Sequence, residues 1–173
     1  MGEVVKTYKQ TVPAVRFIGS KYGDKDRVDG SFAEKWNEWL ISDRFKQLEA
    51  LATEEYKQIY EDALTSIGLM RWKEGEEFEY YIGMFLPEGT EVPDGYDHVD
   101  FSASNFGVCW LHGTVPGIYG QEDKCAKQLS EEGFEITRDN QGALWFFERY
   151  GCPRFTKPDE SGKVILDICY FVK

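Results

Sequence analysis

Apolar residues along the chain fall into short runs that are typical of β-strands, interrupted by segments with helical spacing. The strand-like runs are rich in aromatic and β-branched residues and are bounded by glycine, proline or polar turns. The pattern predicts strands over 11–20, 69–72, 77–86, 96–101, 106–113, 134–136, 144–150 and 164–172. The first ten residues are polar, and we expect them to form an irregular start.

Helical spacing begins at Ser31, and Glu34 three residues later completes a capping-box pattern. The spacing continues through 53–66, and we interpret Gly68 as the C-terminal cap of that helix. A further helix is predicted over about 121–132, where it is stopped by a glycine.

The order of these elements is strand, helix, strands, and then the same order again. This order predicts an α+β fold of two duplicated β-α-β-β modules. Their sheets would join about a pseudo-twofold axis into one antiparallel sheet, with helices packed on it and a central ligand cleft. We expect a single domain over 1–173, with module one at about 11–101 and module two at about 105–173.

One predicted strand, 144–150, carries a carboxylate among aromatic residues. Side chains alternate along a strand, so Phe146, Glu148 and Tyr150 share one face. If that face is buried, Glu148 needs a hydrogen bond, a proton or a bound cation. If the face is solvated, as one face of an antiparallel sheet often is, Glu148 is an ordinary surface charge. The strand alone leaves both alternatives open.

Composition narrows the choice of partners. The net charge of −11 and the lack of a Lys/Arg-rich run argue against nucleic acid as a partner. No apolar run approaches the length of a membrane span and no signal peptide is present, so we expect a cytoplasmic protein with no membrane partner. Aromatic residues make up 16% of the chain, so we expect some of them to line a cavity or an interface as well as the core.

Motifs for metals, cofactors and common catalytic machinery are not recognisable. The four cysteines have no zinc spacing, and the two histidines, His98 and His112, lie in different segments. There is no phosphate-binding glycine loop and no nucleophile elbow. We therefore expect no metal and no cofactor.

Three motifs resemble one known family. The run VPDGYDHVDFSASNFGVCWLHG at Val92–Gly113 resembles its central signature, and FERYG at Phe147–Gly151 resembles its second signature. Together with YYIG at Tyr80–Gly83 and the duplicated order, they resemble the GyrI-like small-molecule-binding domain. The same fold serves as the effector-binding domain of multidrug-sensing bacterial transcription activators. The similarity extends over nearly the whole chain, although each motif is short.

The resemblance implies a hydrophobic pocket between the two modules that accepts lipophilic, cationic aromatic compounds. A buried glutamate on the Phe-Glu-x-Tyr strand faces the ligand in that family, and the matching residue here is Glu148. Activators of this type carry a helix-turn-helix region ahead of the ligand domain. Only about ten residues precede the first predicted strand here, so the chain resembles the stand-alone members.

Further residues are candidates for the pocket. We expect Phe146 and Tyr150 to flank Glu148, and Tyr81 to approach from the opposing module. Other aromatic residues have two interpretations each: pocket wall or core for Trp110 and Tyr170, and lid or core for Trp36 and Trp39.

The leading hypothesis is a small-molecule-binding protein of the GyrI-like type. An alternative, also implied by the resemblance, is a hydrolase of electrophilic compounds such as cyclopropanoids. In that case Glu148 would be the catalytic base, and Tyr150 or Tyr81 would orient the water. A further alternative is a gyrase-interacting or other protein-binding module. The sequence leaves monomer and dimer open.

Overall fold

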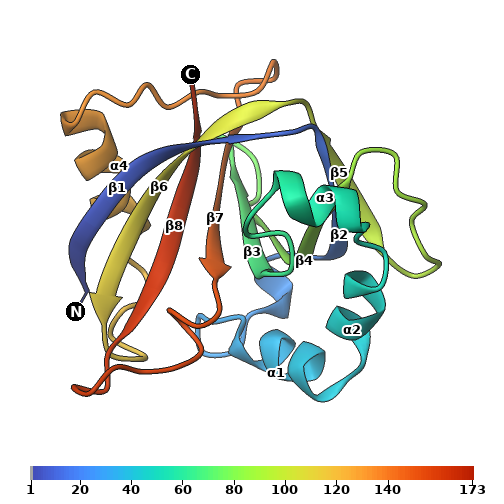
Figure 1. The fold of residues 1–173 in the computed structure, drawn as a ribbon, viewed down its shortest axis with the longest axis horizontal. Coiled ribbons are helices and arrows are strands. Elements are labelled where there is room, and N and C mark those ends of the chain that lie inside the picture. Colours follow the sequence, from blue (N-terminus) through green and yellow to red (C-terminus); the bar gives the residue numbers. More distant parts are fainter. Residues whose placement is uncertain (1) are drawn as a thin grey trace.

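The computed structural model describes residues 2–173; Met1, where the expected single domain begins, lies outside the described residues. These residues form an α+β fold with an eight-stranded, entirely antiparallel open sheet and four α-helices (Figure 1). The fold class therefore agrees with the one predicted from the order of elements.

The sheet has the strand order β1-β6-β8-β7-β3-β4-β2-β5. Its strands are β1 (Glu3–Val12), β2 (Val15–Tyr22), β3 (Ser66–Trp72), β4 (Glu79–Pro87), β5 (Asp97–Phe101), β6 (Ser104–Gly113), β7 (Leu144–Tyr150) and β8 (Val164–Val172). The order is symmetric about the junction between β3 and β7. On one side of that junction lie β3, β4 and β2, on the other lie β7, β8 and β6, and β5 and β1 form the two edges.

Three helices follow β2 and the fourth follows β6 (Figure 1). They are α1 (Ala33–Ile41), α2 (Arg44–Glu49), α3 (Glu54–Ile59) and α4 (Glu122–Glu131), and a short 3-10 turn, Asp24–Asp26, precedes α1. The helix predicted from Ser31 begins two residues later. The Ser31 hydroxyl oxygen accepts a 3.0 Å hydrogen bond from the backbone N–H of Ala33.

The sheet separates two hydrophobic clusters because its side chains alternate between faces. One face carries Met70, Ile82 and Ile168, and it packs against α1, α2 and α4. The other face carries Phe85 and Phe147, together with residues of α3 and the turn after it. Most of β4 is buried on both faces, as expected for a strand inside a covered sheet.

The start of the chain differs from its prediction. Residues 3–12 form β1, which pairs with β6 along its whole length except for one irregularity near Lys6. An edge strand with one solvated face and lysines along it has a weak apolar alternation, and lysines are a usual protection for such edges. Because the segment is polar, the sequence did not predict this strand.

The interpretation of Gly68 as a helix cap was also wrong. Helix α3 ends at Ile59, a turn follows, and Gly68 lies inside β3. Of the strand predicted at 134–136, only Ile136 forms a β-bridge, with Val172. Short apolar runs such as these fit helix and strand equally well, and long-range pairing decides between them.

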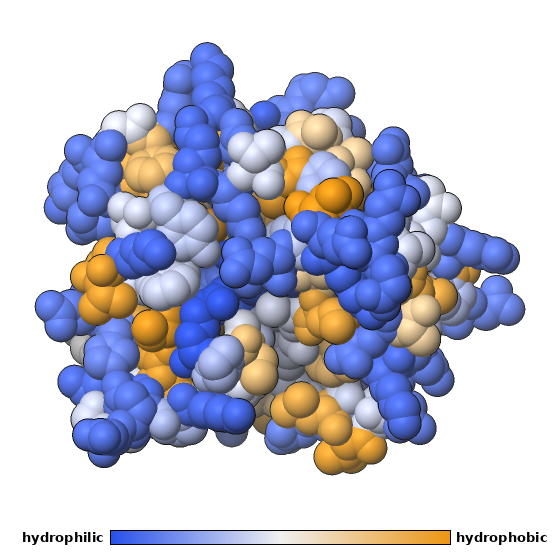
Figure 2. Space-filling view, in the orientation of Figure 1, coloured by the Kyte–Doolittle hydropathy of each residue, from blue (hydrophilic) through white to orange (hydrophobic). Residues whose placement is uncertain are grey.

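Hydrophilic side chains cover most of the face shown in Figure 2, and apolar residues form separate groups between them. None of the helices in residues 2–173 combines the length and the apolar composition that a bilayer span requires.

Candidate functional site

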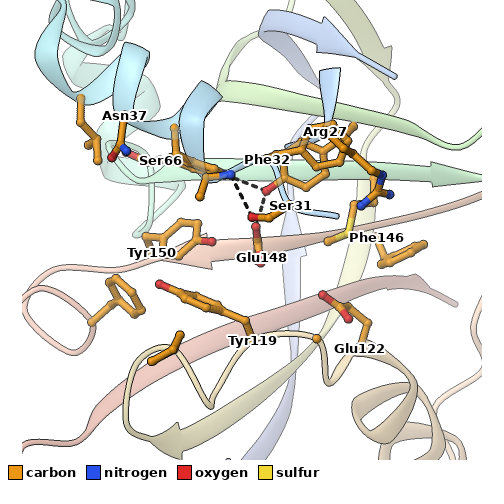
Figure 3. A pocket seen from close by; sticks show the side chains of 18 of the residues that line it. Arg27, Ser31, Phe32, Asn37, Ser66, Tyr119, Glu122, Phe146, Glu148 and Tyr150 are labelled. Carbon is orange, nitrogen blue, oxygen red and sulfur yellow. Dashed lines mark hydrogen bonds between the residues drawn. The ribbon is translucent and has the colours of Figure 1, made fainter. Parts of the chain in front are cut away.

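A cavity of about 810 Å³ lies on the sheet face that packs against α1 and α4 (Figure 3). Strands β3 and β7 form its floor with Ser66, Met70, Phe146, Glu148 and Tyr150. One wall comes from α1 and the loop before it, and the other from the segment that leads into α4. The loop after β7 adds Phe155 and Thr156. The volume is that of a typical small-molecule site.

Glu148 is at the centre of this floor. Its strand pairs with β3 on one side and β8 on the other, so the carboxylate sits between Gly68 and Ile168. Only 7% of the residue is exposed. The Tyr80 hydroxyl donates a short hydrogen bond to Glu148 Oε1, and the Tyr150 side chain lies beside Glu148 on the floor of the cavity (Figure 3).

Burial is the main influence on the ionisation of Glu148, and it raises the pKa of this carboxyl from 4.5 to about 7. The Tyr80 and Tyr150 hydroxyls oppose the rise because they donate to the ionised form. The nearby charge of Glu122 adds to the rise. A carboxyl with this pKa changes its charge near neutral pH, which is a property of many binding and catalytic sites.

Tyr80 is itself held by α1. The Trp36 indole Nε1 donates a 2.9 Å hydrogen bond to the Tyr80 hydroxyl oxygen. The Phe32 ring stacks on the Tyr80 ring, with centroids 4.3 Å apart and planes 8° from parallel. Trp36 also meets Tyr150 edge-on at 4.9 Å. Aromatic rings from the wall thus surround the carboxylate on the floor.

The charges along the cavity are mostly negative. Glu122 and Asp123 line it beside Glu148. Among the described residues that line the cavity, Arg27 is the only Lys or Arg; it is paired with Asp24 at 3.0 Å and lies over the Phe32 ring. This arrangement favours a cation over an anion as a ligand.

Ion pairs on the other face of the sheet hold the loop after β7 in place. Arg154 Nε donates a 2.7 Å hydrogen bond to Asp167, and the guanidinium also bonds Asp62 at 3.0 Å. Arg149, fully buried, pairs with the same Asp167 at 2.8 Å. The next residue in the loop, Phe155, packs edge-on against Tyr150 with centroids 4.7 Å apart. The ion pairs on one face therefore position an aromatic wall on the other.

Three of the residues expected at the site, Phe146, Glu148 and Tyr150, line the cavity together. Tyr170 lies one strand further out. Its ring stacks on Phe146 at 5.1 Å, and its hydroxyl donates to the backbone carbonyl of Glu122. It supports the floor and the second wall without lining the cavity.

The other three expected residues lie elsewhere. Trp39 is fully buried and donates to the Tyr22 hydroxyl at 3.0 Å, so it belongs to the core beneath α1. Tyr81 and Trp110 point to the opposite face of the sheet, where they meet Glu79 and Tyr8, respectively. The cause is alternation: Tyr81 is the neighbour of Tyr80 in β4, and Trp110 is level with Asp167 rather than with Ile168.

Sequence reasoning missed Tyr80, and it named Trp39 rather than Trp36 as the site residue of α1. Both faces of β4 are buried, so the pattern did not show which of its two adjacent tyrosines faces the cavity. Trp36 and Trp39 are three residues apart and therefore share one side of α1. Only the packing of α1 on the sheet decides that Trp36 lines the cavity and that Trp39 lies in the core.

The arrangement can support two kinds of chemistry. A buried, ionisable carboxylate among aromatic rings can balance the charge of an apolar cation. The same carboxylate can act as a base toward a water molecule in a dry cavity. Among residues 2–173, no group of three His, Cys, Asp or Glu side chains is placed to hold a metal ion.

No protein-family model matches the sequence, and neither does any curated protein. Solved structures do share the fold. SAV2435 bound to tetraphenylphosphonium is 17% identical, with a TM-score of 0.67 over 98% of this chain and 94% of that chain. A Staphylococcus aureus MU50 protein, provisionally assigned to bacterial transcription regulation, is also 17% identical, with a TM-score of 0.63 over 98% and 99%.

A hydrolase from Listeria innocua, encoded by lin2189, is 14% identical, with a TM-score of 0.50 over 97% of this chain and 92% of that chain. At such low identities the comparisons establish a common fold and leave the ligand to be argued from the cavity itself.

Proposed function

We propose that this protein is a GyrI-like small-molecule-binding domain that takes a lipophilic aromatic cation into its cavity, with Glu148 as the counter-charge. The observation that carries the proposal is a buried, ionisable carboxylate at the centre of an aromatic cavity of about 810 Å³. The fold shared with SAV2435, whose structure holds tetraphenylphosphonium, supports the same class of ligand.

The physical argument rests on two contributions. The aromatic walls remove apolar ligand surface from water, at about 25 cal/mol per Å². The carboxylate then discriminates by charge, because a charge pair in a site that excludes water interacts more strongly than one in solution. The walls would bind many aromatic shapes, and Glu148 would select the positively charged ones.

Calorimetric titration with tetraphenylphosphonium tests the proposal. We expect Glu148→Gln to weaken binding by about 30-fold or more, because removing one member of a buried charge pair costs at least about 2 kcal/mol. Triphenylphosphine oxide, which is aromatic but uncharged, should lose little affinity in the same variant. The control is Glu160→Gln, which removes one negative charge from an exposed loop. Equal affinity of wild type and Glu148→Gln for the cation would refute the proposal.

A second candidate function is hydrolysis of an electrophilic compound such as a cyclopropanoid. The observation that favours it is a carboxyl with a pKa of about 7 whose two phenol partners lie in the same cavity. Glu148 would take a proton from water while the water oxygen bonds to a ring carbon. The electrons of the broken ring bond would pass to a conjugated carbonyl, which a proton then neutralises.

Incubation with a cyclopropanoid alkylator, followed by mass spectrometry, separates the two functions. Ring-opened product carrying one added water, formed in excess over protein and lost in Glu148→Ala, would establish a hydrolase. Bound but unchanged compound would favour binding alone.

A further inference from the structure

The hydrogen bond between Tyr80 and Glu148 spans three strands. Tyr80 belongs to β4 and Glu148 to β7, and β3 lies between them in the sheet. In the register, Met70 of β3 is level with Tyr80, whereas Gly68 of β3 is level with Glu148. The phenol side chain must therefore cross β3 diagonally, and it reaches the carboxylate directly above Gly68.

The space above Gly68 is fully used by this hydrogen bond. A β-carbon added to Gly68 would lie 2.5 Å from the Tyr80 hydroxyl oxygen, 2.6 Å from Glu148 Oε1 and 2.8 Å from Glu148 Cγ. All three distances are too short for real contacts. The backbone does not explain the glycine, because Gly68 is not among the glycines with positive φ. A glycine inside a strand normally weakens it, so close approach of other groups is the remaining reason.

We propose that Gly68 is a positioning residue for the cation site, because its missing side chain lets the Tyr80 hydroxyl cross β3 and hold the Glu148 carboxylate. This inference rests on the proposed function, since it concerns how the counter-charge is kept in place. Any side chain at this position would push the hydroxyl, the carboxylate or both out of their present contact.

The pH dependence of cation binding reports this contact. The titratable groups that influence or face Glu148 are Tyr80 from β4, Tyr150 from β7 itself, Tyr119 from the segment before α4, and Glu122 from α4. Asp123 and Arg27 line the same cavity farther along. Of these groups, the hydroxyls of Tyr80 and Tyr150 lower the pKa of Glu148, and burial and Glu122 raise it.

The sign of the effect follows. A cation binds best when Glu148 is ionised, so affinity should increase as pH rises through the pKa of this group. Gly68→Ala displaces a donor that favours the ionised form. The midpoint of the affinity–pH curve should therefore move upward by about one pH unit, which lowers affinity about tenfold at pH values below the wild-type midpoint.

The experiment is a titration of tetraphenylphosphonium against wild type, Gly68→Ala, Tyr80→Phe and the double variant, from about pH 5.5 to about pH 9. Both single variants should shift the midpoint upward. The double variant should shift it by less than the sum, because both changes break one contact. Glu148→Gln supplies the reference curve of affinity against pH, because its amide does not titrate.

Gly107→Ala is the matched control. Gly107 is a mid-strand glycine of β6 whose added β-carbon would meet Val172 and Phe134 side chains instead of the cavity. It should lower the melting temperature and leave the midpoint unchanged. If Gly68→Ala behaves like this control, Gly68 is merely structural and the inference is overturned.

Two outcomes separate this inference from the proposed function. If Glu148→Gln binds the cation as tightly as wild type, the proposed function fails and this inference fails with it. If Glu148→Gln weakens binding but Gly68→Ala leaves the midpoint unchanged, only this inference fails. Should Gly68→Ala be too unstable to titrate, the double variant still tests the contact. Tyr80→Phe removes the nearest atom, so Gly68→Ala should cost less stability in the Tyr80→Phe background than in wild type; an equal or larger cost would contradict the inference.

Discussion

At the scale of the residue, Glu148 is buried, so ionising its carboxyl costs free energy. The folded protein raises the pKa of this carboxyl from 4.5 to about 7, chiefly by burial. The folded state therefore holds this proton more tightly than the unfolded chain does. It follows that the free energy of unfolding decreases as pH rises from about 4.5 through about 7, by about 3 kcal/mol for this one group.

Glu148→Gln removes this penalty, because the amide stays neutral at every pH. We expect the variant to be more stable than wild type by about 3 kcal/mol at about pH 8, and the difference to shrink toward zero at about pH 4.5. Urea unfolding at both pH values measures the difference. A constant difference across this range would show that the ionisation of Glu148 is not the cause.

At the scale of single residues, the sequence predicted only part of the site. Glu148 and its two strand neighbours could be placed on one face because alternation within a strand is local. Tyr80 could not be placed at the site, because the sequence does not show whether the face of β4 with Tyr80 or the face with Tyr81 lies under the cavity. Gly68 could not either, because the reason for its small size is a contact between two other strands.

At the scale of the element, the loop after β7 forms part of the cavity wall. Arg154 ties it to Asp167 and Asp62 on the far side of the sheet, while Phe155 packs against Tyr150. Asp167 is fully buried, so each of its cationic partners compensates for lost hydration.

Arg154→Met keeps much of the side-chain length and removes the charge. We expect the free energy of unfolding to fall by about 3 kcal/mol, because a buried carboxylate loses one of its two arginine partners. We also expect a several-fold weaker affinity for tetraphenylphosphonium, because Phe155 is no longer held. Chemical unfolding and calorimetry measure the two effects, and Lys157→Met, an exposed position in the same loop, is the control. Unchanged affinity for tetraphenylphosphonium despite lower stability would show that binding does not depend on this loop.

Most of the covered strands were predicted well, but only 69–72 of the central strand β3 was predicted, because Gly68 was assigned to a helix end; of the two edge strands, β5 was predicted and β1 was missed. The central strands have apolar, aromatic runs that local patterns identify. β1 is an edge strand with a solvated face, and its pairing with β6 connects residues about a hundred positions apart in the chain. Such a long-range contact leaves no periodic signal in the segment itself.

At the scale of the whole molecule, the net charge of −11 surrounds a cavity with acidic residues at its wall and floor. A field of this sign should speed the arrival of cations. We expect the association rate of a cationic rhodamine dye to fall about threefold or more between about 20 mM and about 500 mM salt. Stopped-flow mixing measures it, and an uncharged dye of similar size should show no such decrease. Equal salt dependence for both dyes would rule out steering by the protein charge.

The symmetry of the sheet gives the Gly68–Glu148 pair a further meaning. On its outer side Gly68 pairs with Ile82, and on its outer side Glu148 pairs with Ile168, so the pair occupies equivalent places in the two halves. The same residue at both places would not form this site. Two glutamates would have faced each other with like charges, and two glycines would have provided no carboxylate at all. The two halves of the sheet therefore carry different residues at equivalent places, a glycine on β3 and an acid on β7, and the pocket depends on that difference.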